Sequence, residues 1–205
     1  MAPSYSCAHE DRAEFLAFLG RRAEAMAEIA RINQIDLGPS AAMTEAGVYY
    51  QLRDYPSLVE AAQRGIASNP NEWVEHRDLG IGYEGIGKLS DAIVEYQKAV
   101  ELSNGDQDAG ASLAHAYATI GKRAEAESIL RDLEHGAKDS YVSPYILATI
   151  YAGLYEKDKA IQLLEKAIDQ RSLEVSWNLK ADRRLDNLRS DPRFQDLARR
   201  VGLPQ

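Results

Sequence analysis

The stretch Leu79-Gly80-Ile81-Gly82-Tyr83, followed by Ala92 and Tyr96, decides the fold of this chain. The pattern leucine, small residue, then tyrosine three positions on recurs after 34 residues and again after 68, and so does the later alanine with its large partner. The matching positions are Leu113, Ala114, Tyr117, Ala126 and Leu130, then Leu147, Ala148, Tyr151, Ala160 and Leu164. A fixed period of this length indicates stacked helical hairpins, because one hairpin cannot bury its apolar face alone.

Residues 73–104 form the clearest unit. Its first helix is expected to place Leu79, Tyr83 and Ile86 along one face. Gly80 leaves room for the second helix to approach, and Gly87 with Lys88 makes the turn. The second helix carries an inner stripe at Ala92, Tyr96 and Ala99. In all units we expect the tyrosine ring to pack between helices with its hydroxyl at the rim.

The period resembles that of the tetratricopeptide repeat (TPR), and the resemblance implies an all-α fold. We expect a right-handed α-solenoid of about five TPR helix-turn-helix repeats with a C-terminal capping helix. The repeats cover residues 6–37, 39–70, 73–104, 107–138 and 141–172, which make up an array over residues 1–172. The first repeat is one residue out of register near Gly20. The cap covers residues 173–205, with a helix over 191–201 whose apolar stripe is Phe194, Leu197 and Val201 and which ends at Gly202 and Pro204.

Charge and cysteine content narrow the function classes. The net charge of −8 argues against direct nucleic-acid binding or an acidic membrane surface as a partner. The stretch from Lys180 onward has seven basic and four acidic residues, so it is either a solvated capping helix or a basic docking patch. Cys7 is the only cysteine, which excludes a disulfide framework, and no apolar run is long enough to span a bilayer. We therefore expect a cytoplasmic protein.

The chain offers little catalytic chemistry. Residues 80–85 match G-x-G-x-x-G, but they lie inside a predicted helix rather than after a strand, so nucleotide binding is not expected. The histidines show no metal-ligand spacing; they are His9, His76, His115 and His135. Carboxylate pairs such as Glu125 and Glu127 point to different helix faces. The sequence predicts no enzyme activity, no cofactor and no metal.

The resemblance to TPR proteins implies a concave groove lined by the first helix of each repeat. The groove candidates are Tyr50, Arg77, Ile81, Glu84, His115, Thr119, Tyr145 and Thr149, with Met43, Gly47, Gln51, Val74, Asp108 and Ala111 beside them. Chaperone-binding TPR domains hold a C-terminal carboxylate with a lysine and asparagine clamp. Arg77 with Ile81 and Ala111 with His115 stand at the matching places, so that clamp is missing. The mixed lining suits a helix or an extended peptide, with Arg77 able to bind a carboxylate.

Two longer stretches resemble the C-terminal TPR arms of bacterial multidomain regulators. They are residues 141–160, YVSPYILATIYAGLYEKDKA, and residues 184–204, RLDNLRSDPRFQDLARRVGLP. In such proteins the other end carries a winged-helix domain, a serine/threonine kinase or an adenylate cyclase. The resemblance implies that this chain is an interaction arm, cut from a larger protein or encoded alone.

Three functional hypotheses follow. The first is a scaffold that binds a protein or peptide in the groove. The second is self-association of the first and fifth repeats into a homo-oligomer. The third, a small-molecule or enzyme site, requires a deep polar pocket.

Overall fold

The computed structural model describes residues 4–35, 38–136 and 141–202, and all the regular structure within them is helical. The residues divide into two compact units, with the first ending at Glu95 and the second beginning at Tyr96. The boundary lies inside a helix, so it was not visible as a linker in the sequence. The expected boundaries at 37 and 138 and the helix stop at Pro204 lie outside the described residues.

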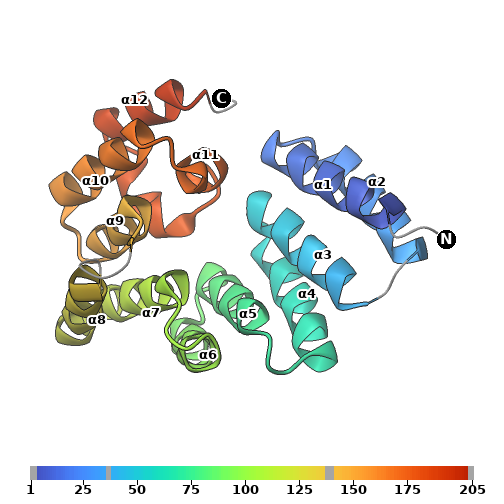
Figure 1. Cartoon of the computed structure of the whole chain (residues 1–205), viewed down its shortest axis with the longest axis horizontal. Coiled ribbons are helices and arrows are strands. Elements are labelled where there is room, and N and C mark those ends of the chain that lie inside the picture. Colours follow the sequence, from blue (N-terminus) through green and yellow to red (C-terminus); the bar gives the residue numbers. More distant parts are fainter. Residues whose placement is uncertain (1–3, 36–37, 137–140, 203–205) are drawn as a thin grey trace. The chain divides into compact units, whose positions relative to one another are not determined.

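Unit 1 consists of consecutive antiparallel helices. They are α1 (Ser4–Phe18), α2 (Arg22–Ile35), α3 (Pro39–Gln51), α4 (Tyr55–Ser68) and α5 (Trp73–Gly85), followed by the start of α6 (Leu89–Leu102). Helix α1 packs against α2 and α3, and α4 packs against α3 and α5, as the ribbon shows (Figure 1). The order along the chain is therefore also the order of packing.

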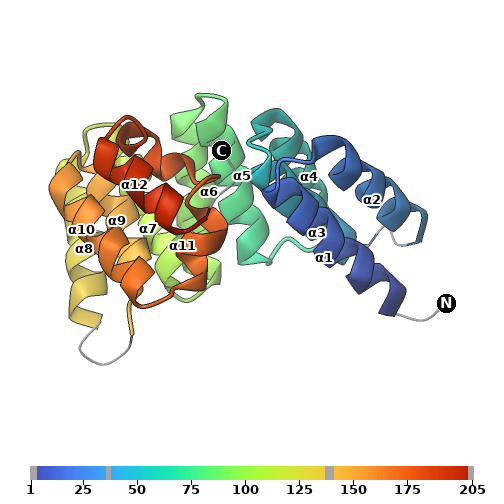
Figure 2. The same ribbon diagram turned by 90° about the horizontal axis from the view of Figure 1, so that it is seen from above.

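Unit 2 continues the pattern and closes with shorter segments. Its helices are α7 (Gln107–Thr119), α8 (Arg123–Gly136), α9 (Pro144–Gly153), α10 (Lys157–Asp169) and α11 (Leu173–Asn178), then a 3₁₀ turn η1 (Arg183–Leu188) and α12 (Pro192–Arg200). Helix α7 packs against α8 and α9, and α9 against α10. The last helix lies along α10 (Figure 2).

The 34-residue period appears in the backbone as a repeated helix stop. Arg53, Gly87, Gly121 and Tyr155, each 34 residues after the last, have φ of 55°, 82°, 81° and 61°. After each of them the next N–H donates to a carbonyl five residues back, for example Lys88 to Tyr83 at 2.8 Å and Glu156 to Tyr151 at 2.9 Å. This is the Schellman arrangement, which needs one left-handed residue at the end of the helix. Gly20 (φ 73°) does the same one register earlier, as the sequence indicated.

The recurring tyrosines tie each odd-numbered helix to the even-numbered helix before it. Gln63 on α4 donates to the Tyr83 hydroxyl at 3.3 Å, and Gln97 on α6 donates to the Tyr117 hydroxyl at 2.8 Å. In the third position the polarity is reversed, because the Tyr151 hydroxyl donates to Glu134 at 2.9 Å. The predicted role of tyrosine, a packed ring with a hydroxyl at the rim, is confirmed.

The small residues of α5 permit close helix contact. A Cβ on Gly82 would lie 2.7 Å from Val59 Cγ2, and one on Gly85 would lie 2.1 Å from Tyr55 Cγ. Both neighbours belong to α4, so the glycines of the G-x-G-x-x-G match serve helix packing. Gly80 is buried as well, whereas Ile86, expected on the inner face, is 40% exposed because it follows the end of the helix.

The predicted inner stripe of α6 is buried, with Ala92, Tyr96 and Ala99 all at 0% exposure. The cap helix predicted at 191–201 is also present. It begins after Asp191, whose carboxylate accepts the Arg193 N–H at 2.9 Å, and it buries Phe194 and Leu197. Helix α11 and turn η1, however, were not anticipated. They are too short to show a helical period in sequence.

We expect Tyr155→Gly to raise the free energy of unfolding by about 1 kcal/mol, because the left-handed backbone strains a residue that carries a Cβ. Tyr155 is 68% exposed, so little packing is lost with its ring. The change is measured by urea unfolding. Tyr155→Ala, which keeps the Cβ, is the control and should bring no such gain; equal stabilisation by both variants would contradict the explanation.

Candidate peptide-binding face

The groove candidates fall on four odd-numbered helices, two in each unit. Tyr50 on α3 and Arg77 on α5 are half-buried, while Ile81 and Glu84 on α5 are 7% and 2% exposed. In unit 2, Thr119 on α7 is exposed and donates to the His115 carbonyl at 2.9 Å. The remaining three, His115, Tyr145 and Thr149, are buried. The structure therefore separates a partly accessible set from a covered one.

In unit 2 the cover comes from the chain itself. The Tyr145 hydroxyl donates to Asp182 Oδ2 at 2.6 Å, and both side chains are at most 1% exposed. Asn187 donates to the Ala152 carbonyl at 2.7 Å, and Leu185 and Leu188 are completely buried. The segment 182–188 thus lies on the face of α7 and α9 on which groove residues were predicted. Tyr145 and Thr149 are enclosed by this packing rather than presented to solvent.

Arg184 anchors that segment. Its guanidinium donates to Asp182 at 2.8 Å, to Asp108 at 2.8 Å and to the Ser112 hydroxyl at 3.0 Å, while only 6% of the residue is exposed. Burial alone would lower the pKa of the guanidinium, but Asp182 and Asp108 outweigh it and raise the pKa well above 12.5. Arg184 is therefore a permanent buried cation that joins the C-terminal segment to α7.

Sequence reasoning did not find this anchor. Asp182 and Arg184 were counted only as members of a basic tail, and Ser112 was not singled out. Asp108 was placed beside the groove, and it does lie at this face. Nothing in a local pattern indicates that residues 72 and 76 positions apart meet, because the contact depends on the path of the chain after α10.

The C-terminal arginines are paired with aspartates. Arg193 contacts Asp158 and Asp191, both at 2.8 Å, and Arg200 contacts Asp169 at 3.1 Å. Arg199 contacts Asp196 at 3.1 Å. These contacts favour the interpretation of the segment as a solvated cap over a basic docking patch, although exposed pairs contribute little to stability.

The accessible candidates lie on α3 and α5 of unit 1, and we call Tyr50, Arg77, Ile81 and Glu84 the α3–α5 face. Arg77 donates to Asp78 at 2.7 Å, and its guanidinium lies 5.5 Å from the centroid of the Trp73 ring. Such a stacked guanidinium is oriented for planar partners such as carboxylates.

The neighbouring helix α1 adds negative charge to unit 1. Its Glu14 lies against Gly47 of α3, where an added Cβ would be 3.0 Å from Oε1. Burial, Asp11 and Glu10 together raise the pKa of Glu14. Residues 1–95 contain 15 acidic and 8 basic residues, so unit 1 has a net charge of −7 and carries most of the chain's negative charge.

An open pocket of about 540 Å³ lies in unit 1 between α2, α3 and α4. Its polar lining is internally paired, because Glu45 accepts from Asn33 at 2.5 Å and forms an ion pair with Arg64. Among the described residues no group of three metal-binding side chains is found, and no helix there is long and apolar enough to cross a membrane. The pocket therefore gives no positive indication of catalytic chemistry.

Comparison with known proteins does not add a family. No family model matches the chain, and no curated protein matches it.

Replacing Arg184 by methionine should destabilise the protein by about 3 kcal/mol or more, because Asp182 then stays buried without its cation. Guanidinium-induced unfolding measures the loss. Arg199→Met removes an arginine that is 64% exposed and should change stability by about 0.5 kcal/mol or less. Similar small effects of both substitutions would show that Arg184 does not anchor the cap.

Proposed function

We propose that this protein is a non-catalytic TPR scaffold that binds a protein or peptide on its odd-numbered helices. In this proposal the chain is a right-handed α-solenoid of about five repeats over residues 1–172, followed by a cap. The support is the agreement between two independent periods. The apolar pattern and the left-handed helix stops both recur at 34 residues.

The observation that carries the binding proposal is the polypeptide already held on unit 2. Segment 182–188 lies on α7 and α9 through two buried leucines, one buried arginine and hydrogen bonds from Tyr145 and Asn187. These are the contacts by which a helical groove binds a peptide in trans. The face of the odd-numbered helices is thus chemically able to hold a short segment.

For a partner in trans, the α3–α5 face is the better candidate. Tyr50 and Arg77 keep part of their surface accessible, and tyrosine and arginine are enriched among residues that dominate binding energy. Arg77 could exchange Asp78 for a partner's carboxylate, and the Trp73 ring would keep its guanidinium oriented. A partner would gain a charge-assisted contact without a large rearrangement.

The resemblance of residues 141–160 and 184–204 to bacterial regulator arms suggests the setting. We place the protein in the cytoplasm, as the interaction arm of a signalling or transcriptional regulator. Metal, cofactor and nucleic acid have no part in this proposal.

The α3–α5 face is tested by placing a photo-crosslinking phenylalanine analogue at Tyr50 and, as a control, at Val94, which is 61% exposed on α6. Adducts with one partner should form in cells from position 50 only. With that partner purified, Arg77→Gln should weaken the Kd about tenfold while circular dichroism stays unchanged. Equal adducts from both positions, or an unaltered Kd, would refute the assignment.

Self-association is the second candidate, and one feature of α1 favours it. Phe15 is 52% exposed, and its ring stacks on that of Phe18 with centroids 6.4 Å apart. Exposed stacked rings on the first helix could pack against a second copy. The fifth hairpin lacks a similar face on its covered side, because α12 packs against α10 and buries Phe194 and Leu197.

Phe15→Ser tests this alternative. If α1 mediates a dimer, sedimentation equilibrium should show a dissociation constant raised at least tenfold by the substitution, since one aromatic side chain in an interface contributes about 1.5 kcal/mol or more. A protein that sediments as a monomer over the whole concentration range would exclude self-association.

A further inference from the structure

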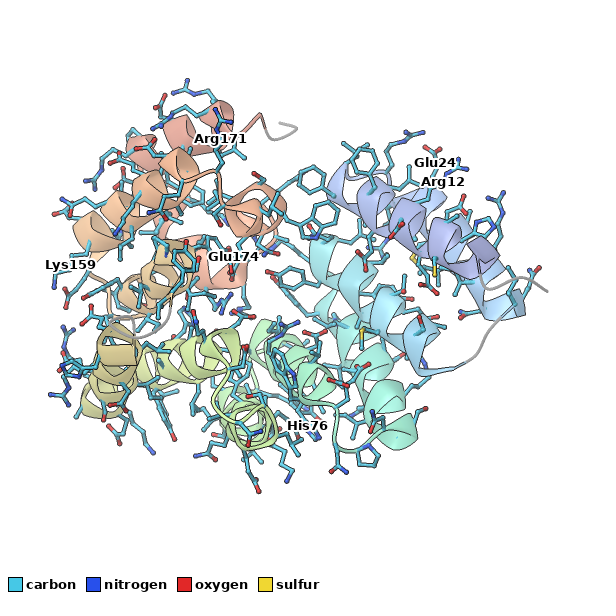
Figure 3. The ribbon with its side chains drawn as sticks, in the orientation of Figure 1. Arg12, Glu24, His76, Lys159, Arg171 and Glu174 are labelled. Carbon is cyan, nitrogen blue, oxygen red and sulfur yellow. The ribbon has the colours of Figure 1, made fainter. Side chains whose placement is uncertain are left out.

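The first turn of α5 carries two adjacent titratable residues that are both buried. Glu75 is 2% exposed and His76 is 8% exposed. Figure 3 labels His76 at this end of the helix. Glu75 lies against α4, whereas His76 reaches α6 and the turn before α5. The proposed peptide-binding function uses neither side chain.

His76 is placed between two hydrogen-bond acceptors. Its Nδ1 lies 2.8 Å from Glu95 Oε2 on α6, and its Nε2 lies 3.0 Å from the Pro70 carbonyl oxygen. A neutral imidazole has one N–H, so it can donate to only one of these oxygens. The imidazolium donates to both. The geometry therefore matches the protonated ring.

Glu75 also favours protonation, for a different reason. Its carboxyl meets Gly65 of α4 so closely that an added Cβ would lie 2.2 Å from Cδ, and Oε2 is buried with no hydrogen-bond partner among the described residues. Burial first, then the negative charges of Asp78 and Glu72, raise its pKa from 4.5 to about 7, opposed only by Arg77. A charged carboxylate here would be poorly solvated.

We propose that the start of α5 is a proton-dependent latch, in which neutral Glu75 packs against α4 while the His76 imidazolium joins α6 to the α4–α5 turn. Loss of the two protons leaves an unpartnered carboxylate against Gly65 and an imidazole that can donate to only one oxygen. The latch then opens more readily.

Both residues change stability in the same direction. The pKa of Glu75 is higher in the folded protein, so its contribution is fully present below pH 4.5 and is lost as the pH rises to about 7. Histidine side chains ordinarily lose their charge between pH 5 and 8, and the second hydrogen bond of His76 is lost with it. The latch is closed at pH 5 and weakened at pH 8.

The histidine of α1 provides a useful contrast. His9 Nδ1 lies 2.6 Å from Glu28 Oε2, the same 19-residue separation as His76 and Glu95. Glu28 also accepts from Arg31 at 2.6 Å and lies 3.4 Å from Arg12. Its carboxylate keeps two cations when His9 is neutral, so only α5 is expected to respond strongly to pH.

Hydrogen exchange tests the latch. After correction for intrinsic rates, amides of residues 73–85 should be protected at least tenfold more at pH 5 than at pH 8, since one unit of pKa shift corresponds to a tenfold change. Amides of α10, in unit 2, are the internal reference. Equal protection of residues 73–85 at the two pH values would overturn the proposal.

Three variants assign the effect to its residues. Glu75→Gln should keep high protection at pH 8, His76→Gln should reduce protection at pH 5, and His135→Gln, at an exposed histidine on α8, should change neither. Proton NMR at pH 5 should show two slowly exchanging ring N–H signals for His76 and only one at pH 8. A single ring N–H at pH 5, or unchanged pH dependence in Glu75→Gln, would overturn the latch.

Discussion

The structure depends on one packing constraint: each helical hairpin exposes an apolar face that the next hairpin must cover. Small residues make this possible. Gly82 and Gly85 allow α4 to approach α5 within van der Waals contact, and Ala148, Ala160 and Ala167 are completely buried in unit 2. Since the covering continues along the chain, it needs an end. In unit 2 that end is the C-terminal segment with its buried leucines.

The way the segment is held has a functional consequence. A fully apolar cap would cover α7 and α9 equally well, but this one also brings the cation of Arg184 between Asp108 and Asp182. Buried ion pairs seldom add much net stability, although breaking one is costly. Their geometry fixes which residue lies where. The cap thereby occupies one part of the binding surface and leaves the α3–α5 face as the site proposed for a partner.

The α5 helix combines packing, charge and proposed recognition in a short stretch. Glu75 lies against α4, His76 reaches α6, and Arg77 lies over Trp73. Because these three are consecutive, a change in how α5 is held would also move the guanidinium. A proton-dependent latch would then influence partner binding, if the proposed function holds; the latch itself rests only on the contacts of Glu75 and His76.

The sequence alone determined the all-helical class, the positions of the turns and the helix that begins after Asp191. These features are local: apolar spacing, a left-handed residue at the end of a helix and a capping aspartate all act within a few residues. Only the tertiary structure decided that Tyr145 and Thr149 are covered, that Arg184 meets Asp108, and that Glu75 and His76 are buried on opposite sides of α5. Those contacts join residues up to 76 positions apart, and the burial they create depends on the folded path of the whole chain.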